Sequence, residues 1–216
     1  MTTRSSSGPT GADSSTGKEV SRFKDRGRVS QALITTLVFL AVIWIVQIVN
    51  ALSGYRLTSL GIHPQDLSRI WGILPAPFIH VDLGHLIANT PAVAVLLFLV
   101  ALSGQKAVWA STTMTMLVAG AGVFAFGGEN TVHVGASSLI YGWAVFLAIR
   151  GLFTRRILEI LLGVVVIIVY AGLFWGIFPN QPGVSWQGHL FGAVGGGLAA
   201  WGSGRTVQKE RAKTRS

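Results

Sequence analysis

Long apolar runs alternate with short polar stretches along most of this 216-residue chain. A helix needs about 20 apolar residues to cross the roughly 30 Å hydrocarbon core of a bilayer. Five runs approach or reach that length, at residues 32–52, 86–102, 107–126, 157–178 and 187–202. A sixth run, 137–149, stops at Arg150 after only thirteen residues. The pattern predicts an all-α, polytopic membrane protein with six transmembrane helices, of which the fourth is short.

The composition agrees with a membrane protein. Half of the residues are hydrophobic and only 12 % are charged, whereas about 25 % are charged in an ordinary soluble domain. The chain contains no cysteine, which excludes disulfides and thiol chemistry.

The net charge of +9 does not indicate a nucleic-acid-binding protein, because of where the charges lie. With six spans and a cytoplasmic N-terminus, fifteen of the seventeen Lys and Arg residues fall in cytoplasmic segments, and only Arg56 and Arg69 fall outside them. This is the distribution that the positive-inside rule predicts. We therefore expect both termini in the cytoplasm and the lipid bilayer, not a nucleic acid, as the partner of the basic segments.

The chain divides into three expected regions. Residues 1–30 are rich in Ser, Thr and Gly and read as a disordered, basic cytoplasmic leader. Residues 31–204 form the six-helix domain, and 205–216 a basic cytoplasmic tail. The apolar run 32–52 is too long for the apolar segment of a signal peptide, so we expect it to be retained as the first span.

The short fourth run places a serine inside the membrane. From Ser137 to Arg150 a helix rises roughly 20 Å. With Arg150 at the cytoplasmic interface, Ser137 lies about 10 Å below the outer surface. The irregular stretch before it, GGENTVHVG, is tolerated at that depth only inside protein or beside a water-filled cavity. The sequence therefore predicts a wet pocket with Ser137 at its floor.

The last run carries a histidine at a similar depth. His189 precedes Arg205 by sixteen residues, or about 24 Å of helix. Gly192 and Gly196 share a helical face with it, in the small-residue spacing that lets two helices approach closely. Packing that face against the small face of the fourth helix would bring His189 to Ser137. His85 and Asn89, four residues apart on the second span, lie at the same level.

These motifs resemble those of one known family. HVDLGHLIAN, GASSLIYG and GHLFGAVGG are similar, in order and spacing, to motifs of the rhomboid intramembrane serine proteases. The resemblance covers residues 32–204 and implies that family's six-helix bundle. It implies Ser137 as nucleophile, His189 as general base and Tyr141 as the tyrosine that packs against the base. Since no Asp or Glu stands where it could orient His189, we expect a catalytic dyad.

The resemblance also assigns supporting residues. His85 and Asn89 match side chains that help the Ser137 amide to stabilise the oxyanion, and Gly135 matches the glycine of the Gly-x-Ser motif. His80 matches a structural histidine of the first external loop.

Two positions depart from the family's pattern. Ser138 replaces a frequent glycine, and Gly72 follows Trp71 where many members carry arginine. The second departure raises the question of how the first external loop is anchored.

The expected function is an intramembrane serine endopeptidase that cleaves single-pass membrane proteins near the outer face of a prokaryotic plasma membrane. We expect helix-weakening residues near the cut, a small residue before it, and no metal or other cofactor. The oligomeric state is left open. Two alternatives are a rhomboid-like pseudoprotease, which would usually lack Ser137 or His189, and a proton-coupled transporter, which predicts an intramembrane carboxylate.

Overall fold

The computed structural model describes residues 14–179 and 183–213, and in this part of the chain the regular elements are all helical. The α-helices are α1 (Ser14–Leu52), α2 (Leu83–Leu102), α3 (Gln105–Phe126), α4 (Ser137–Thr154), α5 (Ile157–Val169) and α6 (Trp186–Lys213). The described residues also form short 3-10 helices, η1 (Arg56–Leu60), η2 (Leu67–Ile73), η3 (Ala76–Phe78) and η4 (Ala171–Ile177).

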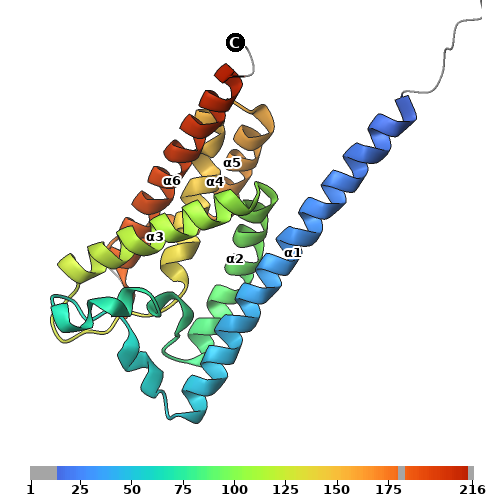
Figure 1. Cartoon of the computed structure of the whole chain (residues 1–216). Coiled ribbons are helices and arrows are strands. Elements are labelled where there is room, and N and C mark those ends of the chain that lie inside the picture. The colour runs from blue at the N-terminus through green and yellow to red at the C-terminus, as the bar shows by residue number, and fades with distance from the viewer. Residues whose placement is uncertain (1–13, 180–182, 214–216) are drawn as a thin grey trace, which may run out of the picture.

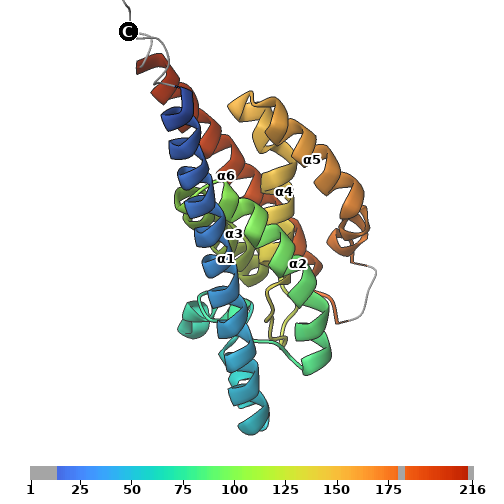
Figure 2. The ribbon, with the colours of Figure 1, turned by 90° about the vertical axis from the view of Figure 1, so that its right-hand side faces the viewer.

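The helices are those of a polytopic membrane protein. By length and composition, four of them can cross a membrane: α1 from Arg26, α2, α3 and α4. The bent pair of α5 and η4 makes a fifth if the two count as one span. The glycine-rich α6, which packs along α4 in Figures 1 and 2, does not meet the same criteria, so four or five spans are identified among the described residues and the sixth stays a prediction.

Several boundaries differ from those that the apolar pattern predicts. The fourth helix continues past Arg150 to Thr154, so it has 18 residues and is less short than expected. The run 157–178 is not one helix, because the chain turns by 65° between α5 and η4. Helix α6 continues beyond residue 204 to Lys213. Helix α1 begins at Ser14, inside the expected leader, whose residues 1–13 lie outside the described residues.

Helix α4 is the centre of the bundle. It packs against α2, α3, α5 and α6, and 61 % of its span is buried, compared with 22 % for α1. Its side chains Leu139, Trp143 and Phe146 have no exposed surface and pack with Leu96 and other residues of α2. A helix surrounded on all sides is held rigidly, because close-packed interiors tolerate little displacement. The position of its first residue, Ser137, is therefore fixed by the core.

The outer helices present apolar side chains to their surroundings. On α5, Leu158, Ile168 and Val169 are each at least two-thirds exposed, and Ile34 and Leu37 on α1 are more than half exposed. In water such a surface would promote aggregation, whereas lipid tails solvate it. The first turns of α1, before Arg28, extend away from the other helices at the upper right of Figure 1.

The loop between α1 and α2, which we expect to be the first external loop, folds as three short 3-10 helices and packs by close backbone contact. A Cβ atom on Gly72 would collide with the carbonyl oxygen of Gly61, and Gly61 in turn lies against Val134 and the carbonyl oxygen of His133. Ile62 and His133 exchange backbone hydrogen bonds of 3.0 Å. The glycine at position 72 therefore allows the loop to be anchored by backbone packing where an arginine would not fit.

Candidate active site

Ser137 and His189 meet at one end of the bundle. The imidazole Nε2 of His189 lies 2.9 Å from the Oγ of Ser137, a normal hydrogen-bond distance. Ser137 is the first residue of α4, and His189 lies in the first turn of α6 and is 8 % exposed. The contact that the sequence predicts between these two side chains is present in the structure.

The other ring nitrogen of His189 fixes its tautomer. Nδ1 lies 2.9 Å from the carbonyl oxygen of Gly176 in η4. A carbonyl oxygen only accepts hydrogen bonds, so Nδ1 carries the proton. In the neutral ring Nε2 is then unprotonated and accepts the hydrogen bond from the Ser137 hydroxyl. The serine and the imidazole are thus arranged for proton transfer from Oγ to Nε2.

Tyr141 holds the imidazole from one side. Its ring stacks on the His189 ring with centroids 4.1 Å apart and planes 10° from parallel. It lies one helical turn after Ser137, so both side chains project from the same face of α4. The Tyr141 hydroxyl also lies against Gly176, where a Cβ atom would collide with it. Stacking and the Gly176 hydrogen bond together restrict rotation of the His189 ring.

Glycines bring α6 close enough to α4 for this contact. A Cβ atom on Gly192 would collide with the carbonyl oxygen of Ser138, and one on Gly196 with the carbonyl oxygen of Gly142. The backbones therefore touch directly along the predicted face. This close approach sets the distance between Ser137 and His189, because Ser137 directly precedes Ser138 and His189 lies one helical turn before Gly192.

His85 and Asn89 lie on α2, and His85 lies next to the residues that precede Ser137. His85 occupies the space next to Gly135, which has a φ of 120° and would place any Cβ atom against the His85 ring. A glycine is needed at position 135 because it tolerates the positive φ and because it has no Cβ atom to collide with His85. The Nδ1 of His85 and the Nδ2 of Asn89 are buried without a hydrogen-bond partner. Unpaired buried polar atoms cost free energy, so these two atoms are candidates for groups that bond to a bound substrate.

His80 supports the loop in front of α4. It has no exposed surface, its Nε2 accepts a long hydrogen bond of 3.4 Å from the backbone N–H of Ala136, and its ring lies edge-on to His85, with centroids 5.0 Å apart. Burial, and then the neighbouring charge of His85, lowers the pKa of His80 to about 4. Asp82 caps α2 by accepting a 2.7 Å hydrogen bond from the His85 N–H, as its position predicts.

The sequence did not indicate the role of His133. His133 is half-buried, and its Nδ1 shares a 2.7 Å hydrogen bond with the Oγ of Ser185. This bond ties the loop before α4 to the residue before α6. Burial lowers the pKa of His133. A signal for this contact was absent because the partners are 52 residues apart and neither lies in an apolar run.

A small cavity opens beside Ser137. Its volume is about 30 Å³, enough for one or two groups the size of a water molecule. Met116, Gly120 and Val123 of α3 form one wall, and Gly135 and Ser138 line it next to Ser137. The site thus combines a serine, an imidazole acceptor, two buried nitrogen atoms without a hydrogen-bond partner and a small recess.

Comparisons with known proteins agree with this geometry. A model of the Rhomboid domain matches residues 67–206. An uncharacterized protein of Mycobacterium tuberculosis and one of Mycobacterium bovis are each 41 % identical over 191 residues, which covers 84 % of this chain and 79 % of each relative. An uncharacterized protein of Mycobacterium leprae is 37 % identical over 188 residues, covering 83 % of this chain and 74 % of that protein. No solved structure matches.

Proposed function

Because this chain belongs to the rhomboid family, we propose that it is an intramembrane serine endopeptidase with Ser137 as nucleophile and His189 as general base. The observation that carries the proposal is the 2.9 Å contact between the Ser137 hydroxyl and the unprotonated Nε2 of His189. Serine is a weak nucleophile without a base within hydrogen-bond reach. A neutral imidazole can take the proton and, once protonated, return it.

The proposed reaction proceeds in two halves. Ser137 Oγ attacks the carbonyl carbon of a peptide bond while His189 Nε2 takes its proton, and then the protonated imidazole gives that proton to the departing amine. An acyl-enzyme on Ser137 is left. A water molecule next attacks the ester carbonyl, His189 takes the water's proton and returns it to Ser137, and the carboxylic acid product leaves.

The oxyanion that forms in both halves needs hydrogen-bond donors. Ser137 lies at the N-terminus of α4, where backbone N–H groups are unpaired and the helix dipole is positive. The unpartnered Nδ2 of Asn89 supplies one side-chain donor, and Nδ1 of His85 supplies a second in the tautomer that carries its proton there. We propose that the stabilisation of the oxyanion offsets the cost of burying these groups unpaired. Each such donor typically contributes about 10²–10³ in rate.

The proposed substrates are single-pass membrane proteins. A helix hides its peptide bonds in its own hydrogen bonds, so the segment to be cut must unwind, and Gly, Pro or polar residues favour this. The small size of the cavity beside Ser137 supports a small side chain before the cut bond. The basic residues Lys106 and Arg156 lie at the opposite end of the bundle from Ser137. By the positive-inside rule, that arrangement supports an active site near the outer face of a prokaryotic plasma membrane.

The experiment is labelling of the detergent-purified protein with a fluorophosphonate probe, together with cleavage of a membrane-helix reporter. We expect Ser137→Ala and His189→Ala to abolish both signals. Ser138→Ala is the matched control, since it removes the neighbouring hydroxyl, whereas the hydrogen bond to His189 comes from Ser137, and it should retain both.

The alternatives give different results in this experiment. Folded wild-type protein that binds the reporter but neither labels nor cuts it would indicate a pseudoprotease and contradict the proposal. Labelling that persists in Ser137→Ala but disappears in Ser138→Ala would show that Ser138, and not Ser137, is the nucleophile.

A further inference from the structure

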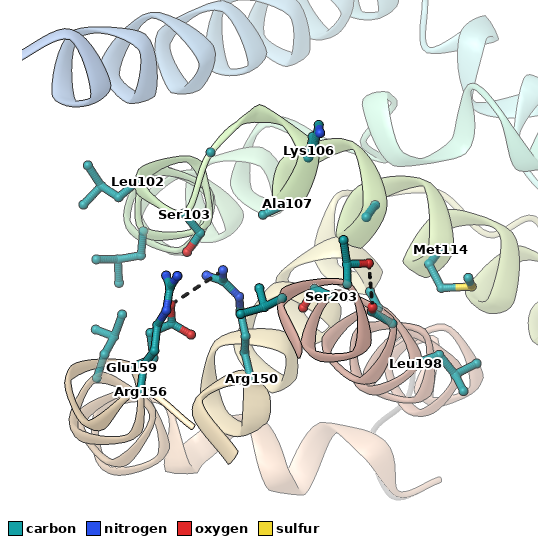
Figure 3. A pocket seen from close by; sticks show the side chains of 18 of the residues that line it. Leu102, Ser103, Lys106, Ala107, Met114, Arg150, Arg156, Glu159, Leu198 and Ser203 are labelled. Atoms are coloured by element: carbon teal, nitrogen blue, oxygen red, sulfur yellow. Dashed lines mark hydrogen bonds and ion pairs between the residues drawn. The ribbon is translucent and has the colours of Figure 1, made fainter. Parts of the chain in front are cut away.

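A large cavity lies at the end of the bundle opposite Ser137. Its volume is about 1320 Å³, and it lies where the first turns of α3 and α5, the last turns of α2 and α4 and the second half of α6 come together. Arg28 of α1 also lines it. Figure 3 shows this cavity from close by. The proposed proteolytic reaction makes no use of it.

The polar part of the cavity is strongly basic. Arg28, Lys106, Arg150 and Arg156 line it, with Glu159 as the one carboxylate among the lining residues. Four cations against one anion leave a net charge of +3. Glu159 already bonds to both neighbouring arginines, at 3.6 Å from Arg150 and 3.3 Å from Arg156. The cavity therefore has positive charge that its own carboxylate does not neutralise.

Arg150 is the least expected member of this group. It lies inside α4, is only 7 % exposed, and its Nε is buried without a hydrogen-bond partner. In Figure 3 the guanidinium groups of Arg150 and Arg156 both point into the space below Ser103. A buried guanidinium with an unused donor is costly unless an anion completes its hydrogen bonds. Guanidinium groups are well matched to phosphate oxygens, which they bind with two parallel hydrogen bonds.

The rest of the cavity wall is apolar. It is formed by Leu99 and Leu102 of α2, Met114 and Leu117 of α3, Leu162 of α5 and Leu198 of α6. These residues follow the helices from the basic end toward the middle of the bundle. A ligand that fills the whole cavity must therefore have a negatively charged head and a long apolar body.

We propose that this cavity binds an anionic phospholipid, with its phosphate on Arg150 and Arg156 and its acyl chains along the leucines. Basic pockets between transmembrane helices on the cytoplasmic side are suited to such head groups. Soluble phosphate compounds share the charge but have no apolar part, so they leave the leucine wall unfilled. The site is separate from Ser137 and His189 and does not depend on the proposed protease activity.

The experiment is native mass spectrometry of the full-length protein in mixed micelles that contain increasing phosphatidylglycerol or phosphatidylcholine. We expect the protein to retain phosphatidylglycerol at least about 30-fold more tightly, because Lys106 and Arg156 each contribute about five-fold in affinity for an anionic lipid. The double variant Lys106→Gln/Arg156→Gln should weaken phosphatidylglycerol binding roughly 30-fold and leave phosphatidylcholine binding unchanged. Both side chains are exposed, so this variant should fold.

The matched control is Arg155→Gln/Lys209→Gln, which removes the same charge from exposed residues that do not line the cavity. It should bind phosphatidylglycerol as the wild type does. An equal loss in the control, or equal binding of both lipids by the wild type, would overturn the proposal. Competition by millimolar glycerol 3-phosphate as effective as that by the lipid would also overturn it, since the site would then recognise phosphate alone.

Discussion

The carbonyl oxygen of Gly176 accepts a hydrogen bond of 2.9 Å from Nδ1 of His189. A backbone carbonyl thus stands where a serine protease triad has a carboxylate, and it fixes the same tautomer without a negative charge. The carbonyl belongs to η4, which follows the 65° bend after α5. The bend therefore brings the Gly176 carbonyl to His189, because a straight helix would carry Gly176 away from it.

We predict that Gly176→Ala lowers kcat by about 10- to 100-fold, because its Cβ atom would displace the Tyr141 hydroxyl and lie 3.1 Å from His189 Nδ1. Reporter cleavage by purified protein measures this. Gly172→Ala, four residues earlier in η4, is the control, since no atom lies within 4 Å of its new Cβ. Equal rates in the two variants would show that η4 does not position the base.

A second prediction concerns the packing of α6 on α4. Gly196→Ala should destabilise the protein by about 1–3 kcal/mol and lower activity, because its Cβ atom meets the carbonyl oxygen of Gly142. The adjacent Gly197→Ala should be neutral or stabilising, because its Cβ atom has ordinary contacts of 3.8 Å to Ile149 and 3.9 Å to Val145 and alanine favours helices. Thermal unfolding in detergent distinguishes the two. Equal midpoints would contradict the close backbone contact.

The Ser137–His189 contact could be predicted from sequence because two kinds of information agree on it. The length of the fourth apolar run set the depth of Ser137, and the spacing of Gly192 and Gly196 set the face of the last helix. That the fourth helix in fact continues past Arg150 does not disturb this result, since Ser137 still begins it. Arg150 was placed at an interface because it is charged, but in the structure it is buried and paired with Glu159.

Other features of the site could not be predicted, for a physical reason. The Gly176 contact uses a main-chain oxygen, which every residue has, so no side-chain pattern marks it. The bend after Val169 falls inside a continuous apolar run, where hydrophobicity does not distinguish a straight helix from a broken one. Contacts between near neighbours in sequence are easier to predict: Glu159 pairs with Arg156 at 3.3 Å, because residues three apart on a helix lie on the same face.

A third prediction tests the anchoring of the first external loop. Gly72→Ala should destabilise the protein by about 1–3 kcal/mol, because the new Cβ atom collides with the carbonyl oxygen of Gly61. Gly72→Arg, which restores the residue that many family members carry, should be worse still. Gly128→Ala, in the loop between α3 and α4, is the control, because the atom nearest to its new Cβ atom, on Thr131, lies 3.4 Å away. Thermal unfolding midpoints measure the effect, and a stabilised Gly72→Arg protein would disprove this packing.

A fourth prediction is a loss of stability on acidification due to His80. Its pKa is lowered from 6.5 to about 4, so between these values the unfolded chain binds a proton that the folded protein does not. The free energy of unfolding therefore falls as the pH drops through this window, by about 3 kcal/mol in total for this residue. We expect His80→Asn to show a shallower fall between pH 6.5 and 4 than the wild type in chemical unfolding. Parallel curves would exclude His80 as the cause.

The last prediction separates the catalytic from the structural role of a buried amide. Asn89 is 7 % exposed and its Nδ2 has no partner, so Asn89→Leu removes no protein hydrogen bond from that atom. We expect kcat to fall by about 10²–10³ if the amide binds the oxyanion, with little change in stability. Asn50 is the contrasting case, because its amide donates to the His80 carbonyl at 3.0 Å and accepts from the Leu57 N–H at 3.0 Å. Asn50→Leu should therefore lose stability, by about 1–3 kcal/mol for each buried group left unpaired. Measuring reporter cleavage and thermal unfolding on both variants tests the assignment, and a destabilised but fully active Asn89→Leu protein would refute it.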